Sequence, residues 1–192
     1  MVMLGLPAAG EVNRKKRVVA MPPAAARQRQ TRGKEVNMER EVRRKDRLIA
    51  AAQAHDLLEN GEYGVLATCG GDRQPYGVPV NYVVIDGAVY IHCAVTGHKL
   101  ENIRENPKVS FTVVGRTQVL PEKFATRYES AIVFGRASIV EDPANKRAAL
   151  QALVAKYAAA HKAAGDDYIE SLIDKTHVIR IAAERVTGKA RR

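Results

Sequence analysis

The sequence has no tryptophan, few other aromatic residues and only two cysteines, and it lacks long apolar runs. A membrane-spanning helix needs about 20 consecutive apolar residues, and no run approaches that length, so the chain is not predicted to be an integral membrane protein. One pair of cysteines does not form a disulfide framework. Cys69 and Cys93 lie inside apolar runs, which is typical of buried thiols in a reducing compartment, and this predicts a cytoplasmic protein.

The usual motifs for nucleotide binding and nucleophilic catalysis are also missing. There is no GxGxxG after a strand, no GxxxxGK[ST] loop and no GxSxG elbow. A catalytic pair of Cys69 and His92 is conceivable, but two buried thiols explain the cysteines more simply. His92, Cys93 and His98 form a single cluster without repeated ligand pairs, and adjacent strand residues point to opposite faces. No metal site is therefore predicted.

Positive charge is abundant but unevenly placed. Residues 1–47 hold 13 of the 31 Lys and Arg residues and only 5 of the 21 Asp and Glu residues. The remaining chain is close to neutral, whereas a nucleic-acid-binding fold carries its basic patch and aromatic residues on the folded surface. A nucleic-acid role, if any, is confined to the basic arm, where it stays an alternative with membrane-surface binding.

Two regions are expected along the chain. Residues 1–38 lack helical or strand periodicity and are predicted to be a disordered basic extension, or an over-extended start, preceding a domain at 39–192. In that domain the periodicity predicts an α+β, mainly antiparallel protein resembling a small closed barrel of about six strands decorated by helices. The expected helices are 42–60, 98–106, 144–161 and 166–174, and the expected strands are 63–69, 75–85, 88–94, 108–115, 127–141 and 177–188, with a loop at 116–126.

Three local features of this pattern carry specific expectations. Asp86-Gly87 predicts a tight hairpin turn, and Gly135 predicts a bulge or bend in a long strand. The prolines of the second strand place it at an edge or bulge of the sheet.

The segment TGHKLENI (96–103) carries an electrostatic conflict. Gly97 precedes a short helix, and His98 and Lys99 fall in its first turn, where the helix dipole disfavours cations. An anion bound at the helix N-terminus would resolve that conflict; a lysine that simply points to solvent explains it equally well. Asn81, in the middle of an apolar strand, suits either the polar rim of a flat heterocycle or a half-exposed strand surface.

Several blocks, in order, resemble a known family. The blocks are YGVLATC, PYGVPVNYVV, VYIHCAVTGHKLENIRENPKVSFTVVG, TRYESAIVFGRASIVED and VTGKA, covering roughly residues 43–191. They resemble the FMN-binding split-barrel flavoproteins of the pyridoxamine 5'-phosphate oxidase-like superfamily, on its nitroimidazole reductase (Nim)-like branch. The resemblance implies a six-stranded antiparallel split β-barrel that forms a homodimer, with FMN in a cleft between protomers.

The same resemblance assigns residues to the cofactor. It implies that Val78, Val80 and Asn81 contact the isoalloxazine, with Thr68 nearby and His92 at the flavin edge. It implies that His98, Lys99 and Asn102 surround the ribityl phosphate, and that Arg127, Tyr128 and Ser130 reach in from the second chain or close the pocket. His92 is the candidate catalytic residue, as a proton donor, although a histidine that only shapes the pocket is the simpler interpretation.

The implied activity is that of an oxidoreductase that reduces a small nitro, quinone or carbonyl compound. The substrate-binding residues of true pyridoxamine phosphate oxidases do not stand out, so vitamin B6 oxidation is not implied. The alternative is a split-barrel protein that binds flavin or haem without turnover, because fold membership does not fix a substrate.

Overall fold

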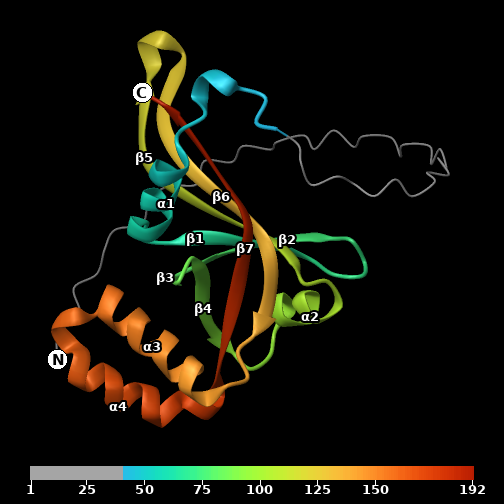
Figure 1. The fold of residues 1–192 in the computed structure, drawn as a ribbon, viewed down its shortest axis with the longest axis vertical. Helices are drawn as coiled ribbons and strands as arrows, with labels where there is room; N and C mark the ends of the chain where they lie inside the picture. Colours follow the sequence, from blue (N-terminus) through green and yellow to red (C-terminus); the bar gives the residue numbers. More distant parts are fainter. Residues whose placement is uncertain (1–40) are drawn as a thin grey trace, which may run out of the picture. The chain divides into compact units, whose positions relative to one another are not determined.

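The computed structural model describes residues 41–192, which include most of the predicted domain. The predicted extension at 1–38 lies outside the described residues. No helix in the described part is long and apolar enough to span a membrane. The chain there forms four α-helices and a seven-stranded sheet, with short 3-10 turns between some of them (Figure 1). The helices are α1 (Ala51–Asn60), α2 (His98–Glu105), α3 (Pro143–Tyr157) and α4 (Lys162–Leu172); the strands are β1 (Gly64–Cys69), β2 (Pro75–Val80), β3 (Val83–Ile85), β4 (Ala88–Ala94), β5 (Lys108–Leu120), β6 (Ala125–Ile139) and β7 (Thr176–Arg191).

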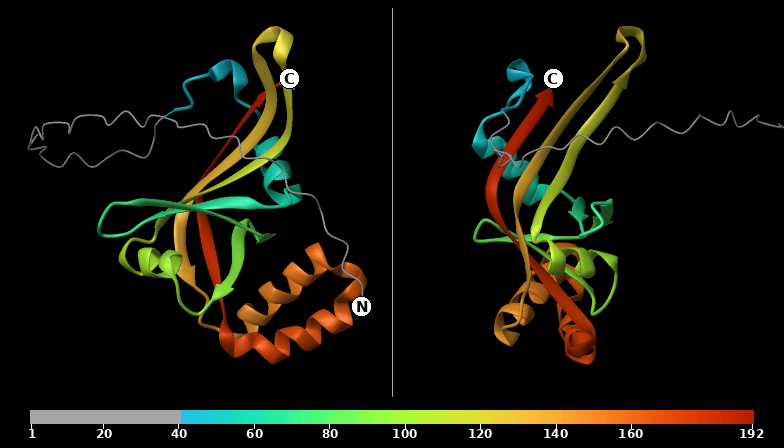
Figure 2. Two further views of the ribbon diagram at one scale, coloured as in Figure 1. Left: turned by 180° about the vertical axis from the view of Figure 1, so that it is seen from behind. Right: turned by 90° about the vertical axis from the view of Figure 1, so that its right-hand side faces the viewer.

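All strand pairs are antiparallel, in the order β2-β1-β5-β6-β7-β4-β3. β2 and β3 are consecutive in the chain yet lie at opposite edges of the sheet, and only Asn81 and Tyr82 join them. A two-residue link can connect the two edges only if the sheet curls until they approach each other. The sheet is therefore a curled half-barrel, consistent with the predicted split barrel, with seven strands instead of six (Figures 1 and 2).

Two hydrophobic clusters lie on opposite faces of this sheet. The larger one fills the curl with side chains such as Leu66, Tyr82, Ile91 and Phe111, and α2 adds Leu100. The second cluster joins α3 and α4 to the outer face of the β3, β4 and β7 strands. Alternation along β4 separates the two, because Val89, Ile91 and Cys93 face the larger core while Tyr90 packs against the helices.

Several local expectations are confirmed. Asp86 and Gly87 both have positive φ, 49° and 73°, and close the β3–β4 hairpin as a two-residue turn. The register of β6 against β7 shifts between Phe134 and Gly135, which is the expected bulge. β2, with its prolines, is an edge strand.

Other expectations are wrong at their boundaries. The helix expected at 42–60 begins only at Ala51, because Leu48 bridges Lys189 of β7 and the Ile49 N–H donates to the Gly188 carbonyl at 3.2 Å. The loop expected at 116–126 is mostly strand, because β5 continues past a register shift and pairs with β6 as far as Leu120. The single strand expected at 75–85 is divided into β2 and β3. The two cysteines are free and half-buried, whereas full burial was expected.

Candidate functional site

The N-terminus of α2 has the geometry expected of an anion site. Gly97 precedes it with φ of 128°, a conformation that favours glycine, and a Cβ placed there would meet nothing within 4 Å, so the space in front of it is open. The N–H groups of Leu100 and Glu101 donate to the Gly97 carbonyl. Those of His98 and Lys99 have no partner within the helix, so they add to the positive end of its dipole.

The side chains at this end of the helix lie close to the neighbouring strands. The His98 ring lies against Tyr76 of β2, with 4.3 Å between ring centroids. Lys99 is half-buried and forms no ion pair within residues 41–192. Burial raises the pKa of the Cys93 thiol on β4, and the nearby Lys99 ammonium opposes that shift. An ammonium without a carboxylate partner, beside open space and a helix N-terminus, suits a phosphate.

Thr68 and Asn102 fix the position of α2 relative to β1. Both are buried, and the Asn102 amide donates to the Thr68 hydroxyl at 2.9 Å. One turn later, the Asn106 amide donates to the Cys69 carbonyl at 3.0 Å. A Cβ at Gly70 would lie 2.6 Å from the side-chain amide oxygen of Asn102, so the glycine permits this close approach. The structure thus gives this pair a positioning role; their predicted contact with a cofactor stays a prediction.

Two free strand edges border the split in the half-barrel. Among the described strands β2 pairs only with β1, so within residues 41–192 its other edge has no partner strand. β3 pairs with β4 only as far as Tyr90, so residues 91–94 have no strand partner on that side within the described part of the chain. The side chains of Val78, Val80 and Cys93 are half-buried and pack against the same core cluster. Val78 and Val80 can therefore offer an apolar rim to a flat ligand lying in the split, and their predicted backbone contacts with it stay a prediction.

Asn81 and His92 belong to a different part of the surface, a cavity of about 340 Å³ between α3, α4 and the outer face of β4. His92 points away from Cys93, as strand alternation predicted. Its ring is at the cavity mouth, and its partial burial lowers its pKa from 6.5. The Asn81 amide donates to the Glu62 carbonyl at 3.5 Å, a long contact. The walls are mostly apolar: Leu150, Leu153, Val154, Ala158, Ile169 and Leu172.

A tyrosine pair, not predicted as part of the site, holds the β2–β3 link beside this cavity. The Tyr157 hydroxyl accepts from the Tyr82 N–H at 3.0 Å and lies 2.8 Å from both the Tyr82 and Glu62 carbonyls. The Tyr82 hydroxyl donates to the Leu58 carbonyl at the end of α1. The buried Lys156 ammonium has no hydrogen-bond partner among the described residues and lies 4.0 Å from the Tyr82 ring centroid. The hydrogen-bond partners of Tyr157 are residues 62 and 82, far from it in the sequence, so no local pattern indicates this role.

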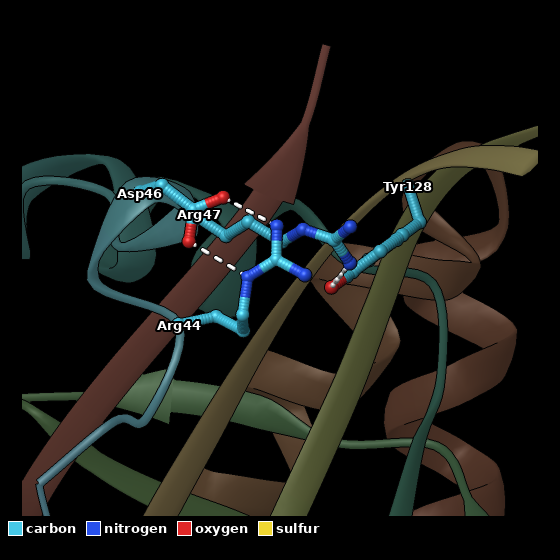
Figure 3. A network of polar contacts seen from close by, with 4 residues as sticks. All are labelled: Arg44, Asp46, Arg47 and Tyr128. Carbon is cyan, nitrogen blue, oxygen red and sulfur yellow. Dashed lines mark hydrogen bonds and ion pairs between the residues drawn. The ribbon is translucent and has the colours of Figure 1, made fainter.

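Arg127, Tyr128 and Ser130 lie on β6, and the first two are near the end of the β5–β6 hairpin, which projects away from α2 (Figure 1). Arg127 donates to Gln118 across the hairpin at 3.3 Å. Tyr128 accepts from Arg47 at 3.4 Å, next to the Arg44–Asp46 ion pair (Figure 3). Within one chain, these residues do not join the α2 group or the Asn81–His92 group.

A larger cleft, of about 750 Å³, lies between α1 and the β5–β6 hairpin. Its walls mix acidic residues, such as Asp56 and Glu129, with Arg116 and Arg192. None of the predicted cofactor residues lines it. We favour the smaller cavity as a ligand site, because apolar walls with a few polar groups are typical of small-molecule pockets.

Within residues 41–192 there is no cluster of three or more His, Cys, Asp or Glu side chains that could hold a metal ion. His92 and His98, two members of the cluster seen in the sequence, lie on β4 and α2 with different neighbours.

Comparison with known structures supports the fold. A conserved hypothetical protein of Mycobacterium tuberculosis matches with a TM-score of 0.68 and 24% identity, over 78% of this chain and 90% of that one. A candidate 5-nitroimidazole antibiotic resistance protein of Bacteroides thetaiotaomicron matches with a TM-score of 0.62 and 21% identity, over 74% and 86%. A FAD-binding protein of Mesorhizobium loti matches with a TM-score of 0.56 and 28% identity, over 76% and 98%.

Comparison with curated proteins found no significant match. The family model described as pyridoxamine 5'-phosphate oxidase matches residues 50–190, which include every element from α1 to β7 except Arg191, the last residue of β7. The chain therefore belongs to the pyridoxamine 5'-phosphate oxidase family of flavin-binding split barrels.

Proposed function

We propose that the chain binds FMN in the split between β2 and β4, with the phosphate at the N-terminus of α2. The observation that carries this proposal is the half-buried Lys99 ammonium without an ion-pair partner in the described chain, beside Gly97 and the open space in front of it. His98, fixed against Tyr76, would add a second donor. The free edge of β2 at Val78 and Val80 would offer backbone groups to the ring system.

The test separates the phosphate from the ring. A charge-assisted hydrogen bond contributes about 1.5–3 kcal/mol, so Lys99→Met is expected to weaken FMN binding by about 10- to 100-fold. Riboflavin, which lacks the phosphate, should bind both proteins equally. The control is Lys108→Met, which removes an exposed lysine just beyond α2. Equal losses for FMN and riboflavin would refute the phosphate role.

We further propose that the protein is an oxidoreductase that reduces a small nitro, quinone or carbonyl compound. A bound flavin supplies the electron-transfer chemistry. The chain contributes the polar side chains of Asn81 and His92, which line an apolar cavity close to the β2–β3 link. The lowered pKa keeps His92 neutral at pH 7, so its ring N–H can donate a hydrogen bond to an acceptor oxygen.

The absorbance spectrum of the purified protein tests the cofactor first, because flavin bands and a haem Soret band are readily distinguished. NADH and NADPH, with nitro and quinone acceptors, then test turnover. A protein that holds flavin but transfers no electrons to any acceptor would favour the alternative of a flavin-binding protein without turnover.

We also propose that the protein is a homodimer with the flavin cleft between protomers. Phe124 at the hairpin tip is 99% exposed and Val119 is 69% exposed. A second copy of the chain would cover these side chains and would bring Arg127, Tyr128 and Ser130 toward the partner's α2. Light scattering coupled to size exclusion should give a dimer mass, and Phe124→Ser should lower the apparent mass on dilution. A monomer at all concentrations would refute the dimer.

A further inference from the structure

The cavity beneath α3 and α4 has a chemical character that the flavin proposal does not explain. Its volume of about 340 Å³ is within the range of small-ligand pockets. It lies on the outer face of β4, whereas Lys99 and the α2 N-terminus belong to the region of Cys93 on the other face. The cavity is therefore separate from the proposed binding site of the FMN phosphate.

Among the residues that the structure describes, the lining contains no Asp, Glu, Lys or Arg side chain. Two of its polar side chains are already engaged: the Thr176 hydroxyl donates to the Leu172 carbonyl at 2.9 Å, and Tyr157 is bonded to the β2–β3 link. His92 has no hydrogen-bond partner within residues 41–192, and the Asn81 amide has only its long contact with Glu62. Together with the hydroxyl of the exposed Tyr168, which also lines the cavity, these two side chains are left to bind a ligand.

An ion entering this cavity would lose hydration without contacting an opposite charge, and that loss costs several kcal/mol. The nearest ammonium, that of Lys156, is not among the lining residues and lies against the Tyr82 and Tyr157 rings. A neutral apolar molecule would instead gain from burial at about 25 cal/mol per Å². A single nitro or carbonyl oxygen on such a molecule could accept from Asn81 and His92, while its apolar body contacts Leu153 and Ile169.

We propose that this cavity is the binding site for a neutral, mostly apolar nitro or carbonyl compound, and that it rejects anionic analogues. This proposal rests on the proposed oxidoreductase function, because it names the class of compound that the oxidoreductase would reduce. Binding itself requires only the α3–α4 cavity.

Methyl 4-nitrobenzoate and 4-nitrobenzoate are suitable probes, because they share the nitro ring and differ in charge. Calorimetry on the full chain is expected to show the ester binding at least ten-fold more tightly than the anion. Anion binding as tight as ester binding would overturn the proposal.

Two adjacent alanines provide a matched pair of variants. Ala158 lines the cavity and Ala159 is exposed outside it. Ala158→Phe should weaken ester binding at least ten-fold, whereas Ala159→Phe should leave it unchanged. Equal effects of the two variants would place the ester elsewhere.

A third measurement covers the case in which Ala158→Phe does not fold. In the wild-type protein, NMR signals of the Asn81 amide and the His92 ring should shift on addition of the ester. Shifts confined to other regions would overturn the proposal.

The flavin content of each sample, measured by absorbance, separates the two proposals. Ester binding to a protein that takes up no flavin refutes the flavin function alone, and a flavin-loaded protein that does not bind the ester refutes the cavity proposal alone.

Discussion

The Tyr82 hydroxyl offers a direct test of how the half-barrel is closed. Tyr82 is one of the two residues that carry the chain from one edge of the sheet to the other, and its side chain is completely buried. Its hydroxyl donates to the Leu58 carbonyl, one of the last four carbonyls of α1. Burial raises the pKa of Tyr82 well above its ordinary value of 10, so the hydroxyl stays protonated and remains a donor.

Tyr82→Phe removes this one hydrogen bond and keeps the ring, so the packing on Phe111 and the contact with the Lys156 ammonium are retained. A buried carbonyl left without its partner costs about 1–3 kcal/mol. In a domain of about 150 residues, each kcal/mol lowers Tm by about 2–4 °C. We therefore expect the Tm to fall by about 2–12 °C.

Thermal unfolding followed by circular dichroism measures the change. All samples need the same flavin concentration, because a ligand that binds only the folded state raises Tm. The control is Tyr63→Phe, since the Tyr63 side chain is 56% exposed and its hydroxyl has no hydrogen-bond partner in the described part of the chain. A Tm for Tyr82→Phe equal to that of Tyr63→Phe would refute the role given to this hydrogen bond.

Two further changes test the sheet and the cavity. Gly135→Ala would place its Cβ 2.1 Å from the Ala182 carbonyl oxygen of β7, and we expect a loss of about 3 kcal/mol in urea unfolding, at the upper end for overpacking. Gly77→Ala, whose Cβ would lie 3.6 Å from the nearest atom, should leave the urea midpoint close to that of the wild type. The free energy of unfolding should decrease as the pH falls below 6.5, because His92 binds a proton more tightly in the unfolded chain than in the folded chain. The urea midpoints at pH 7.5 and 5 should therefore differ less in His92→Gln than in the wild type, and an identical pH dependence would contradict this assignment.

Much of the fold could be predicted because its determinants are local. The alternation of apolar residues gave most strands within a few residues, and Asp86-Gly87 fixed one hairpin through its backbone conformation. The start of α1 was wrong because its cause is distant: Leu48 and Ile49 pair with the last strand, where Gly188 leaves room for the Ile49 side chain. No pattern within residues 42–60 contains that information.

The types of residue in the candidate site could be predicted better than their arrangement in space. The conflict between Lys99 and the helix dipole pointed to α2, and the structure adds that Lys99 has no carboxylate partner among the described residues. Alternation correctly separated His92 from Cys93, but it could not show that α3 and α4 cover the His92 face. That arrangement depends on packing between segments more than 50 residues apart in the sequence.

The β2–β3 link connects the fold to both proposed sites. Because only Asn81 and Tyr82 join the two edges of the sheet, the position of the Asn81 side chain depends on how the half-barrel closes. Tyr157 bonds to both backbone groups of Tyr82 from the end of α3, the helix that also forms a wall of the cavity. A change that loosens this link should therefore alter ligand binding in the cavity and the geometry of the split together, whereas a change at Lys99 should alter only phosphate binding. Comparing Tyr157→Phe with Lys99→Met in the ester and FMN assays would separate these two effects.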